Sequence, residues 1–173
     1  MDSSTGQDRT CNEYNSNVDL LRHVPFFSAM PLEAVKVLAC MCTRELFKAG
    51  DLIFAQDEID EHAYLILAGT AELLLRTELG EESIRFCGES EFIGSFSLLS
   101  IVKRLFSLRA RTDVQCIVLE RERFQRTLDQ FPDSAGGILQ VVTSAIHQWE
   151  YTHLHGHGRL CAQCKAGVGI TLI

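Results

Sequence analysis

The sequence predicts a mainly β fold with flanking helices: an antiparallel, jelly-roll-like β-roll of about eight strands, with helices before, within and after it. Two observations support this fold class. After residue 43, short runs of alternating apolar and polar residues are interrupted by turn residues at intervals of about eight to twelve positions, as in all-β barrels and sandwiches. Outside this region, apolar residues recur three and four positions apart, which is typical of helices.

The composition limits the classes of function. The chain has 173 residues, enough for one domain with appended elements. Its formal net charge of -7 argues against general electrostatic binding to nucleic acid or to an anionic membrane. There is no apolar run of about eighteen residues and no basic, apolar leader, so we expect a soluble, cytoplasmic protein. The seven cysteines favour reduced thiols over a disulfide framework.

The segment before the strands should contain a polar tail and two helices. Residues 1–16 lack periodic apolar positions, which predicts a mobile tail ahead of a domain that spans 17–152. A short helix should then end at Pro25, because the residue before a proline disfavours the helical conformation. Phe26 and Phe27 follow and should enter the core. A second helix should start near Pro31, and its apolar stripe consists of Leu32, Val35, Leu38 and Ala39.

The strands are expected in two groups, before and after residue 100. The first group comprises residues 43–47, 52–55, 63–68, 71–77, 82–87 and 91–93. The second group comprises residues 106–112 and 114–119. Glycines stand at four of the junctions, as expected for tight turns: Gly50, Gly69, Gly80 and Gly88.

Two helices should follow the strands. Residues 120–130 have helical periodicity, and Pro132 should end that helix. A longer helix should begin at Asp133 or Ser134 and run to about residue 153. Its apolar positions are spaced three, four and three apart, like the seam of a coiled coil: Leu139, Val142, Ile146 and Trp149. This seam either packs on the chain's own roll or forms a homodimer.

The stretch 91–110 has features that suit an anion. Gly94 permits a bend, and Ser95–Leu99 suits one short helical turn whose free N–H groups point outward. Arg104 follows ten residues after Gly94, and its planar guanidinium matches two phosphate oxygens. The stretch therefore predicts a phosphate site with these candidate ligand-binding residues: Gly94, Ser95, Phe96, Ser97, Arg104, Leu105, Phe106 and Ser107.

This stretch resembles the phosphate-binding cassette of cyclic-nucleotide-binding domains, the family of the catabolite activator protein and of kinase regulatory subunits, and we call residues 91–110 the cassette. The resemblance extends over residues 18–151 and includes the runs at 20–27, 48–54, 64–69 and 116–124. It implies a regulatory module that binds cAMP or cGMP in the roll and moves its last helix. It also implies a homodimer through that helix. Only about twenty residues follow position 151, so we expect any effector either on a separate chain or outside the present sequence.

Two residues depart from the family pattern. Ser95 stands where the family has a glutamate that accepts the ribose 2′-hydroxyl, a change that costs about 1.5 to 3 kcal/mol of binding. Phe106 stands where the family has a small alanine beside the cyclic phosphate. If Phe106 faces the pocket, it occupies the space of the phosphate; if Leu105 and Ser107 take that face, the pocket survives. The alternative function is therefore a module without ligand that serves as a dimerisation or interaction scaffold.

The tail at 153–173 contains imidazole and thiol groups, the ligands that zinc prefers. The candidate ligands are His153, His155, His157, Cys161 and Cys164. Their spacing matches no common zinc finger, and a polar tail with incidental thiols is the plainer interpretation. A redox function of the Cys-x-x-Cys pair is a third one.

The other polar residues indicate no enzyme. An acidic run at 57–61 precedes His62 and is interpreted as a solvated loop, not as a metal or catalytic site. The sequence contains no Ser-His-Asp order and no glycine-rich nucleotide loop. Arg109 and Arg111 alternate on a strand and point either toward Arg104, as a second cation, or into solvent.

Overall fold

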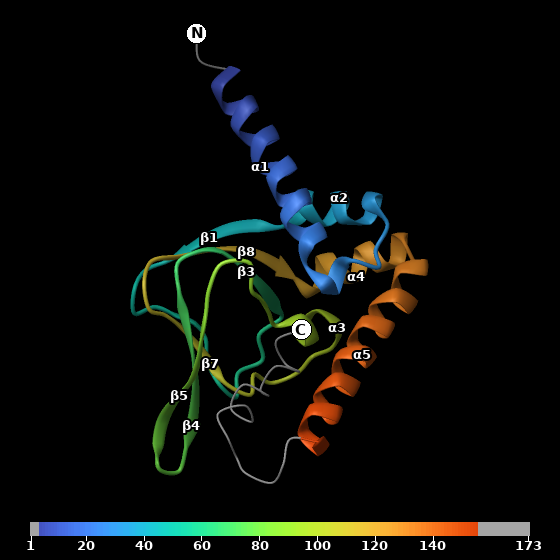
Figure 1. Ribbon diagram of the computed structural model, residues 1–173. Helices are drawn as coiled ribbons and strands as arrows, with labels where there is room; N and C mark the ends of the chain where they lie inside the picture. Colours follow the sequence, from blue (N-terminus) through green and yellow to red (C-terminus); the bar gives the residue numbers. More distant parts are fainter. Residues whose placement is uncertain (1–3, 156–173) are drawn as a thin grey trace.

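Two four-stranded antiparallel sheets form a roll (Figure 1). The computed structural model describes residues 4–155, with the side chains of residues 12–148 and 151. One sheet has the order β1-β8-β3-β6 and the other β2-β7-β4-β5. The strands are β1 (Thr43–Phe47), β2 (Leu52–Phe54), β3 (His62–Ala68), β4 (Ala71–Thr77), β5 (Gly80–Cys87), β6 (Phe92–Ile93), β7 (Ser107–Ala110) and β8 (Val114–Glu120). Each of the eight predicted strands overlaps one of these, so the predicted fold class is confirmed.

The strand pairing places the cassette beside the start of β3. Strand β6 pairs with β3 through Tyr64 and Ile93, so the chain leaves β6 next to the first residues of β3. On its other side β3 pairs with β8, where His62 lies opposite Glu120. The cassette returns to the second sheet as β7, which pairs with β2 and β4. The cassette therefore spans the gap between the two sheets.

Helices cover one end of the roll. They are α1 (Ser4–His23), the 3-10 helix η1 (Pro25–Phe27), α2 (Leu32–Met41), α3 (Ser95–Leu99), α4 (Arg121–Gln130) and α5 (Asp133–His155). Helices α2 and α4 lie together at the end of the roll, and α5 runs from there past α3 (Figure 1). Within the described part of the chain, no helix is long and apolar enough to cross a membrane.

Helix α1 begins earlier than the sequence analysis predicts. The expected helix contained the apolar residues from Val18 onward, whereas α1 starts at Ser4. Its amino-terminal turns extend away from the roll (Figure 1). A helix that projects in this way needs no apolar stripe, and hydrophobic periodicity cannot detect such a segment. The domain boundaries at residues 16 and 152 stay predictions.

The core consists of two hydrophobic clusters. The helix-side cluster contains four phenylalanine rings with centroids 5.1 to 6.4 Å apart, from η1, β6 and α4: Phe26, Phe27, Phe92 and Phe124. The roll cluster lies between the sheets and includes Phe54, Tyr64 and Phe106. The cassette contributes to both clusters, because Leu98 is buried in the first and Phe106 in the second.

Candidate functional site

Gly94 brings the cassette backbone against an arginine side chain. It precedes α3 with a φ of 95°, a left-handed conformation that favours glycine. A Cβ atom at this position would lie 2.5 Å from Arg104 Nη1 and 3.0 Å from the carbonyl oxygen of His62. Any larger residue would therefore push the guanidinium out of place. The sequence prediction of a bend at Gly94 is confirmed, and its steric reason is Arg104.

Arg104 is buried and held from several sides. Its side chain is 5% exposed, and Nη2 donates hydrogen bonds to Asp60 Oδ2 at 2.7 Å and to the carbonyl oxygen of His62 at 2.6 Å. Nε donates to the same Asp60 oxygen at 3.2 Å. The guanidinium carbon also lies 4.0 Å from the centroid of the Phe54 ring, within cation–π range. Nη1 has no acceptor among the described residues.

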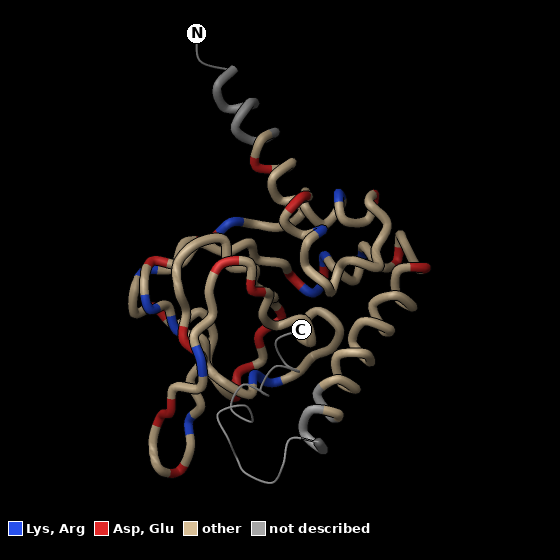
Figure 2. Tube along the Cα trace, in the orientation of Figure 1, with Lys and Arg blue, Asp and Glu red and all other residues tan. Residues whose placement is uncertain are grey.

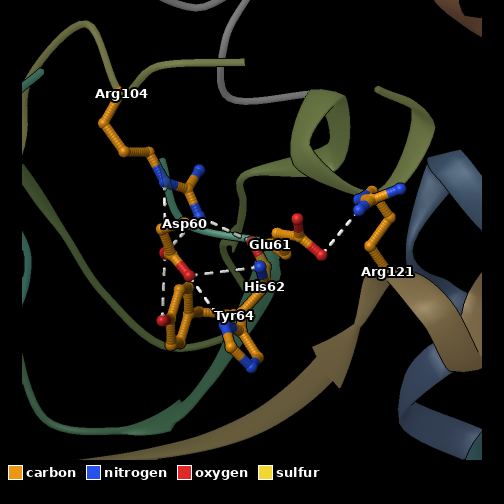
Figure 3. A network of polar contacts seen from close by, with 6 residues as sticks. All are labelled: Asp60, Glu61, His62, Tyr64, Arg104 and Arg121. Carbon is orange, nitrogen blue, oxygen red and sulfur yellow. Dashed lines mark hydrogen bonds and ion pairs between the residues drawn. The ribbon is translucent and has the colours of Figure 1, made fainter. Parts of the chain in front are cut away.

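Asp60 is the centre of the polar network (Figure 3). Besides the bonds from Arg104, its carboxylate accepts hydrogen bonds from His62 Nδ1 at 2.7 Å and from the Tyr64 hydroxyl at 3.1 Å. Burial raises the pKa of Asp60, but the hydrogen bond from His62 and the charge and hydrogen bonds of Arg104 outweigh it and hold the pKa below its usual value. Asp60 is therefore ionised at neutral pH and partly neutralises Arg104.

His62 links this network to the surface. Its side chain is 43% exposed, and the hydrogen bond to Asp60 raises its pKa above the usual 6.5. Burial and the neighbouring carboxylate raise the pKa of Tyr64, so the phenol stays protonated and donates to Asp60. Next to this network, Glu61 forms an ion pair with Arg121 at 2.6 Å (Figure 3).

A cavity of about 340 Å³ lies at the cassette. Apolar side chains form most of its wall, and the lining residues are Gly94, Phe96, Ser97, Leu99, Ser100, Val102, Lys103, Arg104, Leu105 and Phe106. Its volume falls in the range of small-molecule sites, which is about 300 to 1,000 Å³. The buried hydroxyls of Ser95 and Ser97 have no hydrogen-bond partner among the described residues. The site thus combines one arginine, one lysine, unpaired hydroxyls and an apolar wall.

Arg104 is a local cation and not part of a broad basic face. Along the described chain, Lys and Arg residues are interspersed with Asp and Glu (Figure 2). Arg109 and Arg111, the two alternatives for a second cation, form ion pairs with Glu81 at 3.1 Å and with Glu72 at 3.5 Å. Neither contacts Arg104 among the described interactions.

The structure brings together six of the eight predicted ligand-binding residues: Gly94, Phe96, Ser97, Arg104, Leu105 and Phe106 line the cavity. Ser95 is fully buried next to them but is not part of the wall. The Ser107 hydroxyl instead accepts a hydrogen bond from the Gln56 backbone N–H at 2.9 Å. Whether these residues bind a ligand stays a prediction.

Phe106 takes the inner face of the strand that follows Arg104. The Phe106 side chain is buried, and the centroid of its ring lies 5.8 Å from the centroid of the Phe54 ring. Leu105, by contrast, is 62% exposed. Phe106 is also among the residues that line the cavity. Of the two sequence alternatives, an inward-facing Phe106 is confirmed and an inward-facing Leu105 is wrong. Whether a phosphate still fits beside the ring stays a prediction.

Sequence reasoning missed the partner of the arginine. The prediction of a solvated loop for the acidic run at 57–61 is wrong for Asp60: its side chain is 12% exposed and contacts Arg104. Asp60, His62 and Tyr64 are two residues apart, a spacing that places side chains on one face of a strand. That alternation was the available signal.

The predicted metal cluster falls mostly outside the described residues. His153 and His155 lie in the last turn of α5, where side chains are not described, and the other three candidates follow residue 155. Among the described residues, no group of three or more His, Cys, Asp or Glu could hold a metal ion. Zinc binding thus stays a prediction without support.

The predicted seam of α5 is divided between two environments. Val142 is buried against the helix-side cluster, which agrees with packing on the chain's own module. Leu139 is 64% exposed, and Ile146 packs partly against the same cluster. The side chain of Trp149 is not among those described.

Comparison with known proteins gives one matching family model and a set of similar chains. The model of the cyclic nucleotide-binding domain matches residues 44–131, just over half of the chain. A cAMP-dependent protein kinase regulatory subunit from Blastocladiella emersonii is 29% identical over 128 residues, which cover 73% of this chain and 32% of that protein. A cyclic AMP receptor protein from Thermus thermophilus is 30% identical over 126 residues, with coverages of 72% and 58%. The chain thus spans less than two thirds of the length of these relatives.

The fold is also found in solved structures. The N-terminal domain of a transcriptional regulator from Streptomyces coelicolor A3(2) superposes with a TM-score of 0.68 at 26% identity. This superposition covers 75% of the present chain and 94% of that domain. The two-sheet roll and its helices therefore form a unit that also occurs as a separate domain in another protein.

Proposed function

The chain belongs to the cyclic nucleotide-binding domain family, and on this premise we propose that it is a non-catalytic regulatory module whose cassette binds cAMP or cGMP. The single observation that carries the proposal is the position of Arg104, which lines a cavity of ligand size and has a buried guanidinium. The similarity to a cyclic AMP receptor protein makes cAMP the first ligand to test.

The unpaired polar atoms of the site support an anionic ligand. Asp60 and the His62 carbonyl occupy Nε and Nη2 of Arg104, which leaves Nη1 available beside Gly94. Ser97 lines the cavity, and its buried hydroxyl has no hydrogen-bond partner in the described part of the chain. An unpaired buried hydroxyl costs about 1 to 3 kcal/mol, so a ligand oxygen that bonds to it recovers this energy. A phosphate supplies such oxygens together with the negative charge that Arg104 attracts.

In this proposal, the ligand signal reaches α5 through α4. The Gln125 side chain on α4 donates a hydrogen bond to the carbonyl oxygen of Leu98 in α3, at 2.7 Å. Phe124 of α4 and Ile138 of α5 share the helix-side cluster. A ligand that shifts α3 therefore acts on α4 directly and on α5 through the packed cluster.

Calorimetric titration tests the binding function. We expect cAMP, cGMP or both to bind, with an affinity lowered by about one to two decades because Ser95 replaces the family's glutamate. Adenosine is the matched control ligand, since it keeps the base and ribose of cAMP but lacks the phosphate, and it should bind much more weakly. No heat with either cyclic nucleotide at millimolar concentration, or equal affinity for cAMP and adenosine, would contradict the proposal.

A scaffold without ligand is the second candidate function. The buried ring of Phe106 favours it, because this side chain takes space beside the cavity that a small residue leaves open. The exposed Leu139 on α5 is then a contact for a second copy of the chain. Sedimentation equilibrium distinguishes this case. A dimer that Leu139→Glu dissociates, together with no heat of binding for cAMP or cGMP, supports the scaffold.

A further inference from the structure

Arg104 and His62 share one carboxylate. His62 Nδ1 contacts Asp60 Oδ1 at 2.7 Å, while Arg104 contacts Oδ2 at 2.7 and 3.2 Å (Figure 3). Asp60 carries one negative charge, Arg104 one permanent positive charge, and His62 a positive charge only when it is protonated. The net charge of this three-residue cluster therefore changes from zero to plus one when His62 binds a proton.

We propose that His62 is a positioning residue that makes anion binding at the cassette depend on pH. Protonated His62 takes a share of the negative charge of Asp60, which leaves the Arg104 guanidinium more positive toward the cavity. Neutral His62 leaves Asp60 to compensate Arg104 alone. This inference rests on the proposed function, since it concerns the regulation of the same site.

Acidic side chains around His62 favour its protonated form, whereas the Arg104 guanidinium on the other oxygen of Asp60 opposes it. Glu120 on β8 lies opposite His62 in the sheet, and Glu45 on the neighbouring strand β1 also raises the histidine pKa. Glu120 also forms an ion pair with Arg123 at 2.9 Å, and Glu61, on the loop before β3, forms an ion pair with Arg121. The hydrogen bond to Asp60 and the charges of Asp60, Glu120 and Glu45 together raise the pKa of His62 above the ordinary value of 6.5.

The sign of the effect follows from the charges. Anion affinity should be highest while His62 is protonated and should fall as the pH rises through the histidine pKa. By linkage, bound anion should raise the pKa of His62 by a matching amount. His62 is partly exposed, and its charge acts through Asp60, so solvent screening limits the change in affinity to roughly threefold to tenfold.

The experiment is a cAMP titration between about pH 5.5 and about pH 8.5, a range that brackets histidine ionisation. A cyclic phosphodiester keeps its single charge over this range, so the ligand does not titrate. His62→Asn is the test variant, because asparagine can donate a hydrogen bond in place of Nδ1 but does not ionise. His23→Asn is the control, since His23 is exposed on α1 and, among the described residues, its ring contacts the Asp19 carbonyl oxygen.

We expect the wild-type and His23→Asn affinities to fall together with rising pH and the His62→Asn affinity to stay constant. A constant wild-type affinity, or a fall that persists in His62→Asn, would overturn the inference.

A measurement without ligand separates this inference from the proposed function. The NMR resonance of the Arg104 Nε–H group should shift with pH along the same titration curve as the His62 ring. If cAMP binds at no pH, the proposed function fails, and this resonance decides the inference alone. A titration curve common to both residues supports the coupling between them. An Arg104 chemical shift that does not change when His62 ionises overturns it.

Discussion

The helix-side cluster and the roll cluster differ in what they bury. The first consists of apolar side chains, mostly from the helices together with β3, β6 and β8, and its centre contains four phenylalanine rings. The second also contains aromatic rings, but one of them, Phe54, packs against the guanidinium of Arg104. The first cluster is therefore an ordinary core, whereas the second surrounds a buried ion pair.

This difference indicates which part of the molecule serves stability and which serves function. Apolar packing of a phenylalanine contributes free energy without any partner beyond its neighbours. A buried ion pair rarely stabilises a protein more than apolar residues of the same volume, because both charges lose their hydration. The Arg104–Asp60 pair is therefore consistent with the proposed binding function and is not needed to explain stability. Three predictions follow the contrast from the largest expected effect to the smallest.

The largest effect should come from the helix-side cluster. Phe124→Ala removes a fully buried ring and should lower the free energy of unfolding by about 3 to 5 kcal/mol, as measured by urea denaturation. Phe86→Ala is the control, because Phe86 is exposed on β5, and it should change stability by less than about 1 kcal/mol. Similar losses in the two variants would show that the aromatic centre is not the main core.

A smaller loss should come from the roll cluster. Asp60→Ala leaves Arg104 buried without its counter-ion and should cost about 2 to 4 kcal/mol of stability. The double variant Asp60→Ala, Arg104→Met removes both charges and should recover most of this loss. Thermal unfolding of the three proteins provides the measurement. If Asp60→Ala is as stable as the wild type, the ion pair is not buried in the way described.

The smallest effect should be the pH dependence of stability in the polar network. The pKa of Asp60 is lowered by folding, so its contribution should be lost as the pH falls through the folded-state value. The pKa of His62 is raised by folding, so its contribution should be complete below about 6.5 and be lost as the pH rises through the raised value. We expect urea denaturation at a series of pH values from below about 6.5 upward to show that the wild type is more stable than His62→Asn at low pH. This difference in the free energy of unfolding should shrink as the pH rises. A difference that is constant or grows would contradict the assignment.

Local patterns in the sequence were sufficient for the strands and for the cassette. Alternating apolar residues identify strands because one side of the strand is buried, as in β7, and Gly94 and Arg104 are identified by residue type and spacing. The start of α1 could not be predicted in this way, since its polar turns extend away from the roll.

Long-range contacts were not predictable from these patterns. Asp60 and Arg104 are 44 residues apart, and only the folded chain brings them together. The orientation of Phe106 depends on the register of β7 against β2 and β4, which short-range periodicity leaves open. The parts of the site that required the structure are therefore the counter-ion and the position of one ring.

The affinity of Arg104→Gln for cAMP tests the central claim, that this buried guanidinium is the anion ligand of the cassette. Arg109→Gln is the matched control, because Arg109 is paired with Glu81 on the surface of the same segment. The account predicts a loss of about 2 to 4 kcal/mol for Arg104→Gln, which is roughly 30-fold to 1,000-fold in Kd, and less than about a twofold change for Arg109→Gln. A folded Arg104→Gln protein that binds cAMP as tightly as the wild type would contradict it.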